Sequence, residues 1–414
     1  MDFQESKDIN ISNIPKEWKV ERLGDEKVCE IIMGQSPSSL TYNEAGDGLP
    51  FLQGNMEFGP IHPSPTVFCN KPIKIAEEND VLISVRAPVG ELNISQTRVC
   101  IGRGLASIRC NPNKVSHLFL FYYLKSKAKE LENISAGSTF KAIRKNDIER
   151  LSVPLPPIGE QRKIAEILST VDQAIQKVGQ AIEKTERLKK GLMQELLTKG
   201  IGHKDFKKTA IGKIPKEWQL VRLGDSEIAE IRRNKTHFNF ETVAFVPMEL
   251  IPDSGIFTEF KIRPLKEVRS FTYCEKGDLL LAKITPSLEN GKQGIVPDDI
   301  PNGFALATTE VFPILCKRVN KLYLFYILKH PIFRNKIIYS MIGTTGRQRA
   351  SKESIERLLI PLPPLPEQQK IAEILSSVDK RIETLRKRKE RLEKVKRGLM
   401  EDLLTGKKRV KLED

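Results

Sequence analysis

The residues best suited to catalysis form one short cluster in the second half of the chain, where Pro252-Asp253 precedes Glu259-Phe260-Lys261. Two carboxylates and a lysine at this spacing could hold Mg²⁺ and activate a water molecule, as in a nuclease. The pattern is short and degenerate, and Pro-Asp-Ser-Gly is also a common turn sequence. The first half of the chain has no counterpart. We therefore interpret the cluster as a turn.

Other catalytic motifs are missing from the sequence. The five histidines are scattered, and the chain contains no GxxxxGK[ST] phosphate-binding loop. It has no glycine-rich strand-to-helix turn for S-adenosylmethionine and no Asn/Asp-Pro-Pro-aromatic tetrapeptide of the adenine methyltransferase kind. The six cysteines include no CxxC pair, so we expect reduced, packed thiols rather than a zinc site. The sequence predicts a binding protein without a cofactor or metal of its own.

The charge of the chain favours an anionic partner. With 68 basic and 53 acidic residues the net charge is +15, which suits nucleic acid. A soluble protein rich in Lys and Glu from a warm-living microbe would be charged in the same way. No stretch approaches the roughly 18 consecutive apolar residues of a membrane span, and the start lacks a signal-peptide pattern. We expect a cytoplasmic protein.

The elements that must position any functional residue occur twice. The segment 14–25, "IPKEWKVERLGD", returns as "IPKEWQLVRLGD" at 214–225, an offset of 200 (214 − 14). The segment 154–175, "PLPPIGEQRKIAEILSTVDQAI", returns at 361–382 as "PLPPLPEQQKIAEILSSVDKRI", an offset of 207 (361 − 154). Such self-similarity indicates an internal repeat.

The similarity fades in the middle of each half, between about 29–115 and 230–320, where we find no run that aligns. The two halves therefore share their flanking segments and differ in the insert between them. This pattern is expected of a protein whose two halves perform the same function on two different targets. Short β-like runs and turn signals mix there with one clear helix in each half, at 118–130 and 322–335. This predicts an α/β or α+β fold, and the sequence does not choose between the two.

Each half ends in a long helix that begins after "PLPP", since proline ends the preceding strand. Apolar residues then recur in alternating steps of four and three, which is typical of a coiled-coil seam. They are Ile164, Leu168, Val171, Ile175, Val178 and Ile182 in the first helix, and Ile371, Leu375, Val378, Ile382 and Leu385 in the second. Further apolar residues, including Leu188 and Val395, extend both stripes. We expect the helices to pair antiparallel within the chain; pairing with another chain is the alternative.

The order of these motifs, given twice over nearly the whole chain, resembles the specificity subunit of type I restriction-modification systems. The resemblance implies two target-recognition domains, each reading half of a split DNA site. They would occupy residues 1–157 and 201–364. The connection between the repeats, at 199–213, is Gly- and Lys-rich and has no apolar period, so we interpret it as a linker. The helices, at 158–200 and 365–414, would set the spacing and dock the methyltransferase subunits.

The resemblance also implies partners: double-stranded DNA, modification (methyltransferase) subunits, commonly two, and restriction (motor-nuclease) subunits. S-adenosylmethionine, ATP and Mg²⁺ would belong to those subunits, and this chain would be non-catalytic. Two alternatives stay open. A stand-alone DNA-binding regulator could dimerise through the helices, although two unequal domains count against it. An enzyme could use the cluster at 252–261.

One candidate for DNA contact is a strand end followed by a polar turn. It covers Ile83–Asn93 and, in the second half, Leu281–Gly294. Side chains on such a turn can meet base edges or phosphates, and a salt bridge beside the turn is the alternative. The candidate residues are Arg86, Lys283, Thr285, Asn290 and Lys292.

The stretches Gly137–Ile148 and Gly343–Ile355 are a second candidate, because glycine and small hydroxyl residues there expose backbone N–H groups to phosphates. The basic residues that follow are Lys141, Arg144, Lys145, Arg347, Arg349 and Lys352. A solvated helix start with Ser and Thr caps is the alternative. The basic run Arg386–Arg397 is interpreted first as a solvated helix face, and otherwise as a surface along the DNA backbone.

Overall fold

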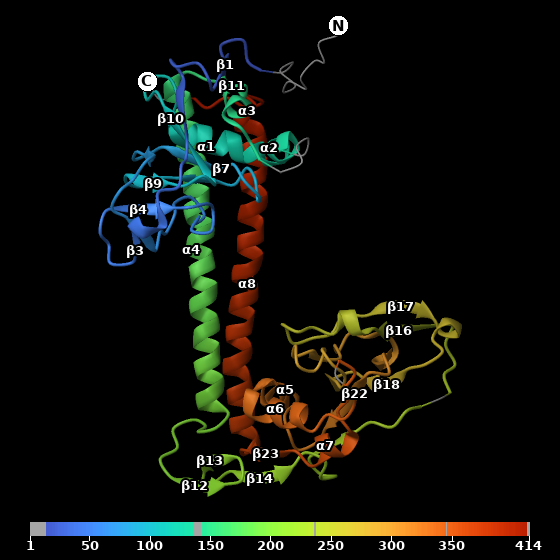
Figure 1. The fold of residues 1–414 in the computed structure, drawn as a ribbon. Helices are drawn as coiled ribbons and strands as arrows, with labels where there is room; N and C mark the ends of the chain where they lie inside the picture. The colour runs from blue at the N-terminus through green and yellow to red at the C-terminus, as the bar shows by residue number, and fades with distance from the viewer. Residues whose placement is uncertain (1–13, 136–141, 236, 345, 412–414) are drawn as a thin grey trace. The chain divides into compact units, whose positions relative to one another are not determined.

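The computed structural model describes four stretches of the chain: residues 14–135, 142–235, 237–344 and 346–411 (Figure 1). The chain divides into two compact units, which we describe one at a time. Unit 1 comprises Met1–Gly179 and Arg388–Asp414, and unit 2 comprises Gln180–Lys387. The boundaries fall inside two long helices, so each unit holds one globular part and a segment of both helices.

The globular part of unit 1 contains two sheets. The four-stranded sheet has the order β2 (Cys29–Met33), β10 (Leu105–Cys110), β7 (Val81–Ser84), β8 (Leu92–Ile94). The five-stranded sheet has the order β3 (Tyr42–Asn43), β5 (Val67–Cys69), β4 (Leu49–Leu52), β9 (Val99–Ile101), β6 (Ile75–Ala76). A cluster of buried residues that includes Leu52, Leu82 and Ile101 joins the two sheets.

Three short helices and a strand pair complete this part: α1 (His117–Ser126), α2 (Ala128–Ser135), α3 (Lys145–Glu149), and antiparallel β1 (Lys19–Arg22) with β11 (Ser152–Leu155). Helix α1 is buried from Phe119 to Leu124 and belongs to the main core, together with residues of the four-stranded sheet. Its N-cap Ser116 accepts a hydrogen bond from the Phe119 N–H, which satisfies one of the free donors of the first turn.

Unit 2 repeats this plan. Its sheets have the orders β15 (Ala229–Ile231), β22 (Val311–Cys316), β19 (Leu279–Ala282), β20 (Gln293–Ile295) and β17 (Lys261–Pro264), β16 (Thr242–Val246), β21 (Phe304–Ala307), β18 (Thr272–Glu275). Two strand pairs are β14 (Gln219–Arg222) with β23 (Leu359–Leu362), and β12 (Phe206–Thr209) with β13 (Gly212–Pro215). The short helices are α5 (Lys321–Lys329), α6 (Pro331–Tyr339) and α7 (Lys352–Glu356).

The two inserts, which do not align in sequence, therefore share most of their topology, and β3 of unit 1 is the strand without a counterpart among the described strands of unit 2. In both four-stranded sheets the strand order and antiparallel pairing correspond, and the parallel pair β4–β9 corresponds to β16–β21. The strands are mostly antiparallel and the helices follow them, which is an α+β arrangement. The equivalent strands β7 and β19 are buried along their whole length, so the core is kept while the exposed residues differ.

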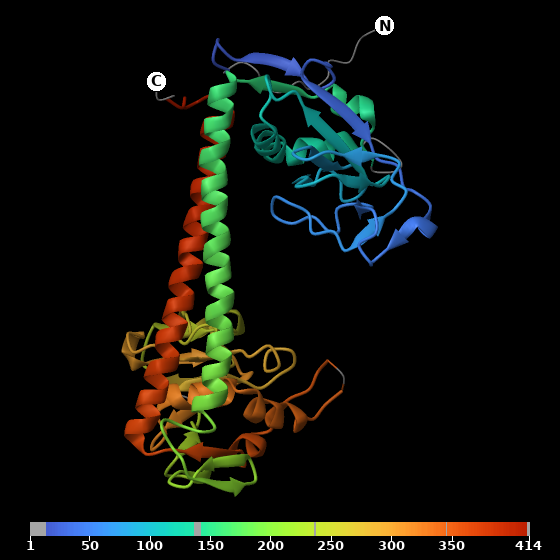
Figure 2. The same cartoon turned by 90° about the vertical axis from the view of Figure 1, so that its left-hand side faces the viewer.

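The long helices are α4 (Ile158–Leu196) and α8 (Leu365–Leu404), of 39 and 40 residues. Within unit 1 the start of α4, at Ile164 and Leu168, shares a core cluster with Leu403 near the end of α8. Within unit 2 the end of α4, at Leu196, shares one with Ile371 near the start of α8. The predicted antiparallel pairing within one chain is confirmed, and Figure 2 shows both helices side by side.

A triad of Tyr, Asp and Lys ties both long helices to the globular part in each unit. In unit 1 Tyr122 Oη donates to Asp172 Oδ2 at 2.9 Å, and Lys396 Nζ lies 2.6 Å from Asp172 Oδ1. In unit 2 Tyr326 Oη donates to Asp379 Oδ2 at 2.7 Å, and Lys189 Nζ lies 2.6 Å from Asp379 Oδ1. Burial raises the pKa of both phenols, so they remain hydrogen-bond donors.

The predicted seam is buried in part. Residues near the globular parts, such as Ile164 and Leu375, are fully buried, whereas Val171, Ile175, Ile182 and Val378 are half-buried. The expected extension of the stripe is wrong at Leu188 and Val395, which are 56% and 51% exposed. An α-helix of 3.6 residues per turn drifts from a 3.5-residue repeat, so the stripe rotates out of the seam.

The segment 199–213 is not the open linker that its Gly- and Lys-rich composition predicts. It includes β12 and the start of β13, which form an antiparallel hairpin, and it is held by the Glu367 carboxylate. This group accepts hydrogen bonds from the Ile201 N–H at 3.0 Å and from Trp218 Nε1 at 2.9 Å. Gly200 has φ +70° and a Cβ there would lie 2.5 Å from the Trp218 ring, so only glycine fits this turn.

Among the described residues, we find no helix that is long and apolar enough to span a membrane.

Candidate nucleic-acid interface

In unit 1 the two predicted DNA-contact stretches meet. Arg86, just after β7, is exposed and forms a β-bridge with Ala142. The Ile143 N–H donates to the Val85 carbonyl at 3.0 Å. The turn after β7 therefore lies beside the segment that leads into α3, although more than 50 residues separate them (142 − 86).

The same arrangement occurs in unit 2. Ile284, just after β19, forms a β-bridge with Arg349. The Ala350 N–H donates to the Lys283 carbonyl at 2.8 Å, and the Thr285 N–H donates to the Gln348 carbonyl at 3.1 Å. The sequence indicated these two stretches as separate candidates for DNA contact. The fold brings them together into one surface. We call this surface the paired turn of each unit: Arg86 and 142–145 in unit 1, and 283–292 and 346–352 in unit 2.

The basic residues of the paired turns are mostly exposed. Arg144 and Lys145 begin α3, where the Arg144 N–H donates to Asp147 Oδ2 at 2.8 Å and Lys145 Nζ lies 3.5 Å from Glu149 Oε1. These charges are free to meet phosphates at little cost, because exposed ion pairs are weak. Lys141 lies outside the described residues.

In unit 2 Arg347 and Asn290 are exposed, and Lys352 Nζ lies 3.3 Å from Glu356 Oε1. Arg349, with a side chain 63% exposed, places Nη2 2.7 Å from Glu310 Oε1. Sequence reasoning missed Glu310, which precedes β22 and orients Arg349. No pattern in the sequence connects residues 310 and 349.

Three other candidates in unit 2 already have partners within the protein. Lys292 Nζ donates to the carbonyls of Met248 at 3.1 Å and Ile251 at 2.8 Å. Lys283 Nζ lies 5.4 Å from the centre of the Phe312 ring, a cation–π distance. Thr285 Oγ1 donates to Glu289 Oε1 at 3.0 Å. These contacts stabilise the turn, so Lys292 in particular has the weakest claim to DNA.

Near the sheet strands of each unit, a buried carboxylate pairs with an arginine. Asp80 accepts hydrogen bonds from Arg109, on β10, at 3.1 and 3.2 Å. Asp278 accepts from Arg232, just after β15, at 2.5 and 2.8 Å. The arginine comes from β10 in unit 1 and from the residue just after β15 in unit 2, and β15 is equivalent to β2, the neighbour of β10. The two arginines therefore do not stand at matching sequence positions, although the pairs are equivalent in space.

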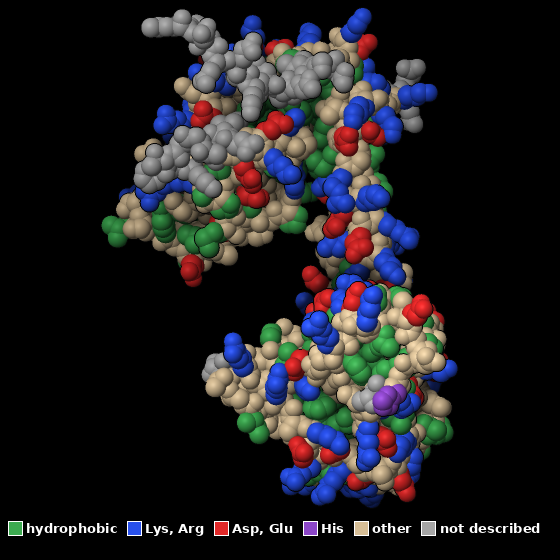
Figure 3. Space-filling model, turned by 90° about the vertical axis from the view of Figure 1, so that its right-hand side faces the viewer, with side chains coloured by type: hydrophobic (Ala, Val, Ile, Leu, Met, Phe, Trp, Pro, Cys, Tyr) green, Lys and Arg blue, Asp and Glu red, His purple; other side chains and the backbone are tan. Residues whose placement is uncertain are grey.

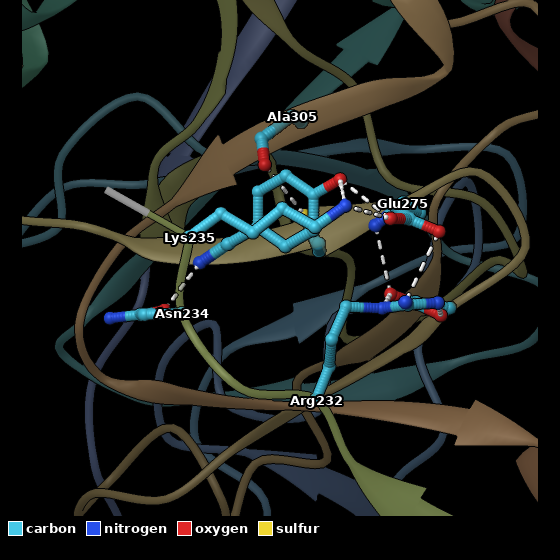
Figure 4. Close-up of polar contacts among 8 residues, drawn as sticks. Arg232, Asn234, Lys235, Glu275 and Ala305 are labelled. Carbon is cyan, nitrogen blue, oxygen red and sulfur yellow. Dashed lines mark hydrogen bonds and ion pairs between the residues drawn. The ribbon is translucent and has the colours of Figure 1, made fainter. Parts of the chain in front are cut away.

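In unit 2 this pair belongs to a larger polar cluster (Figure 4). Arg232 Nη1 also lies 3.1 Å from Glu275 Oε2, and Lys235 Nζ lies 3.0 Å from Glu275 Oε1. The hydrogen bond from Tyr273 Oη, at 2.6 Å, holds the pKa of Glu275 below its usual range, helped by Lys235 and Arg232. The cluster fixes the segment that follows β15 against β18.

The cluster at 252–261 has the contacts of a turn. The Asp253 carbonyl accepts from Lys329 Nζ at 2.6 Å, and Lys261 Nζ lies 4.0 Å from a different acid, Glu249. In the stretches that the structure describes, no group of three or more His, Cys, Asp or Glu side chains is placed to hold a metal ion.

The basic run 386–397 is partly paired. Arg386 Nη2 lies 2.7 Å from Glu186 Oε1, and Lys396 belongs to the unit 1 triad. Figure 3 shows Lys and Arg side chains across the visible face with Asp and Glu among them. The triads were also missed, although the repeat held the signal: Tyr122 and Tyr326, Asp172 and Asp379, and Lys189 and Lys396 stand at matching positions.

Two segments of the chain, residues 15–187 and 215–394, match the family model described as the type I restriction modification DNA specificity domain. The chain belongs to this family. The two matches also confirm the internal repeat.

Among named relatives, the type I restriction enzyme MjaVIII specificity subunit of Methanocaldococcus jannaschii is 30% identical over 414 residues, which cover 98% of this chain and 96% of that protein. The MjaX specificity subunit of the same organism is 48% identical over 192 residues, 46% of this chain and 45% of that protein. A crystal structure of the type I restriction-modification S subunit from M. genitalium aligns with a TM-score of 0.60 at 16% identity, over 97% of this chain and 98% of that one. At this identity the likeness shows the fold alone.

Proposed function

We propose that this specificity-family chain is the sequence-specific DNA-binding subunit of a type I restriction-modification complex. Residues 1–157 and 201–364 form its target-recognition domains, and each reads one half of a bipartite, asymmetric DNA site. The helical regions 158–200 and 365–414 set the spacing and dock the methyltransferase subunits.

The observation that carries this proposal is one scaffold with two different turns. The Ser84 N–H donates to the Glu91 carbonyl in unit 1, and the Ala282 N–H donates to the Lys292 carbonyl in unit 2. These equivalent contacts close turns of different length, because the bonded residues are seven positions apart in unit 1 and ten in unit 2 (91 − 84 and 292 − 282). Different side chains on equivalent turns are what two independent readers of base edges require.

The partners follow from the same proposal. Double-stranded DNA binds to the paired turns, two modification subunits bind to the helices, and restriction subunits join the complex in the cytoplasm. The chain is non-catalytic, and S-adenosylmethionine, ATP and Mg²⁺ are bound by the partner subunits. The net charge of +15 supports binding to a polyanion.

Reconstitution tests this function. With its methyltransferase partner the chain should direct methylation to one split, non-palindromic site, because the two turns differ. The chain alone should transfer no methyl group. Mapping of methylated adenines on random-sequence DNA gives the readout. Methyl transfer by the isolated chain with S-adenosylmethionine, or methylation at a palindromic site, would overturn the proposal.

The helices should act as a ruler for the unread gap between half-sites. One heptad added near Val178 and another near Thr384 lengthens both helices between their triad residues and keeps the seam in register. Seven residues add about 10 Å, so the gap should grow by roughly three base pairs at about 3.4 Å each.

DNA bending could absorb part of this change, so growth by about two to four base pairs agrees with the proposal. Both half-motifs should stay the same, and methylation mapping measures the gap. A lengthened, active complex that still methylates the original spacing would show that the helices do not set the distance.

A further inference from the structure

Two thiols face each other at the base of the unit 1 insert. Cys29 on β2 and Cys110 on β10 are directly opposed in the antiparallel register, and their Sγ atoms lie 3.9 Å apart. The Cys29 N–H donates to the Asp25 carbonyl and not across the strands. The next pair carries the ladder bond, from the Asn111 N–H to the Val28 carbonyl at 2.9 Å.

The opposed cysteines are therefore a non-hydrogen-bonded pair. The Cα atoms of such a pair lie about 4.5 Å apart, and a disulfide spans Cα distances from about 4.4 to 6.8 Å. The sulfur atoms need only small side-chain rotations to bond. The backbone of the two strands already has the required separation.

One of the two thiols is reachable. Cys29 is buried, whereas Cys110 is half-buried and lines an open cavity of about 740 Å³. Asp80, Arg109 and Arg162 also line this cavity, so a small polar molecule can enter it. The hydrogen bond with Cys29, followed by burial, raises the pKa of Cys110 well above its usual value, so Cys110 rests as a thiol.

We propose that Cys29 and Cys110 form a disulfide when the protein meets a small-molecule disulfide. The Cys110 thiolate attacks one sulfur of that molecule, and the other sulfur leaves as a thiolate. The Cys29 thiolate then attacks Cys110 Sγ and displaces the second small thiolate. Both leaving thiolates take up the protons that the cysteines lost, so two cysteines are oxidised and one small disulfide is reduced to two thiols.

The bond would enclose nearly the whole insert of unit 1. Cys29 and Cys110 are 81 positions apart, and the loop between them contains Arg86 of the paired turn. A crosslink around so long a loop restricts the unfolded chain strongly. Unit 1 should therefore unfold at a temperature higher by on the order of 10 °C after oxidation.

Unit 2 contains a natural control at the same place. In the register of β15 and β22, Ala229 stands opposite Cys316. Cys316 is half-buried like Cys110, and burial raises its pKa to about 12. Unit 2 keeps this strand pair without a second thiol, so Cys29→Ala introduces into unit 1 the residue that unit 2 already tolerates.

The test uses the full chain incubated with oxidised glutathione, followed by blocking of free thiols, peptide mass mapping and thermal unfolding. A Cys29–Cys110 crosslink is expected, with the remaining four cysteines blocked and a rise of the unit 1 midpoint that a reductant reverses. Free Cys29 and Cys110 after treatment, a mixed disulfide that persists on Cys110, or a crosslink without a rise would each overturn the proposal.

Two variants complete the test. Cys29→Ala should lose the crosslink, and oxidised glutathione should no longer raise its midpoint above the value that the same variant has in reductant. Ala229→Cys in the Cys29→Ala background should move the crosslink to unit 2, between position 229 and Cys316. A rise that survives in Cys29→Ala alone would show that another group is responsible.

Discussion

Charge reversal of Arg347 and Arg349 (R347E/R349E) should weaken binding to every DNA duplex on the order of 100-fold at physiological salt. Both side chains are exposed on the paired turn of unit 2, beside the backbone of Thr285. Phosphate contacts position a protein without reading sequence, so cognate and random duplexes should lose affinity alike. The slope of log affinity against log salt should flatten by roughly 1.8, about 0.9 for each lost contact.

Titration of both duplexes at several salt concentrations measures this effect. Arg318→Glu is the matched control, because Arg318 is exposed and paired with Glu227. Arg318 lies after the end of β22, whereas Glu310 lies before its start. It should change the affinity little. Because R349E places a second carboxylate beside Glu310, R347Q/R349Q should also be measured, with about half the effect. A changed methylated motif with an unchanged salt slope would show that these arginines read bases.

The repeated elements of the molecule could be predicted from the sequence, because the same motifs occur twice and the long helices have periodic apolar residues. The steps of four and three from Ile164 and from Ile371 predicted both long helices, and the structure confirms their antiparallel pairing. The prediction that the apolar stripe continues to Val395 was wrong, because the 3.6-residue turn of the helix rotates this position out of the seam. The prediction of an open linker at 199–213 was also wrong. The Glu367 carboxylate orders this segment, although the hairpin there has no apolar pattern of its own.

The sequence could not predict that the two inserts have the same fold, because they share backbone pairing and contacts but not residue types. The Asp–Arg pair is built from β10 in one unit and from the segment after β15 in the other. For the site, local signals found the strand end at Arg86 and the glycine-rich stretch before α3 separately. Their pairing through Ala142 is a long-range contact, which a single sequence does not encode locally.

The largest effect is expected from exchange of an insert. Replacing residues 30–115 by the corresponding insert of a relative with a different target should replace one half of the methylated motif completely. The strands from β3 to β10 lie within the exchanged segment, whereas α1 (His117–Ser126) remains from this chain. The new turn therefore arrives on its own strands. The contacts of the frame, including the Tyr122–Asp172–Lys396 triad, stay in place.

The reciprocal exchange of residues 230–320 is the matched control and should replace the other half. It carries the turn at 283–292 and Glu310, while the segment 346–352 remains from this chain. A half-motif that changes only in part would then assign some base contacts to Arg347 or Arg349. The spacing between the half-motifs should not change in either exchange, because both long helices are untouched.

Genome-wide mapping of methylated adenines in cells that carry the 30–115 exchange tests the central claim most directly. We predict a motif with one new half, one unchanged half and the original gap. A motif in which both halves change together, or an unchanged motif, would contradict the account of two independent readers on one repeated frame.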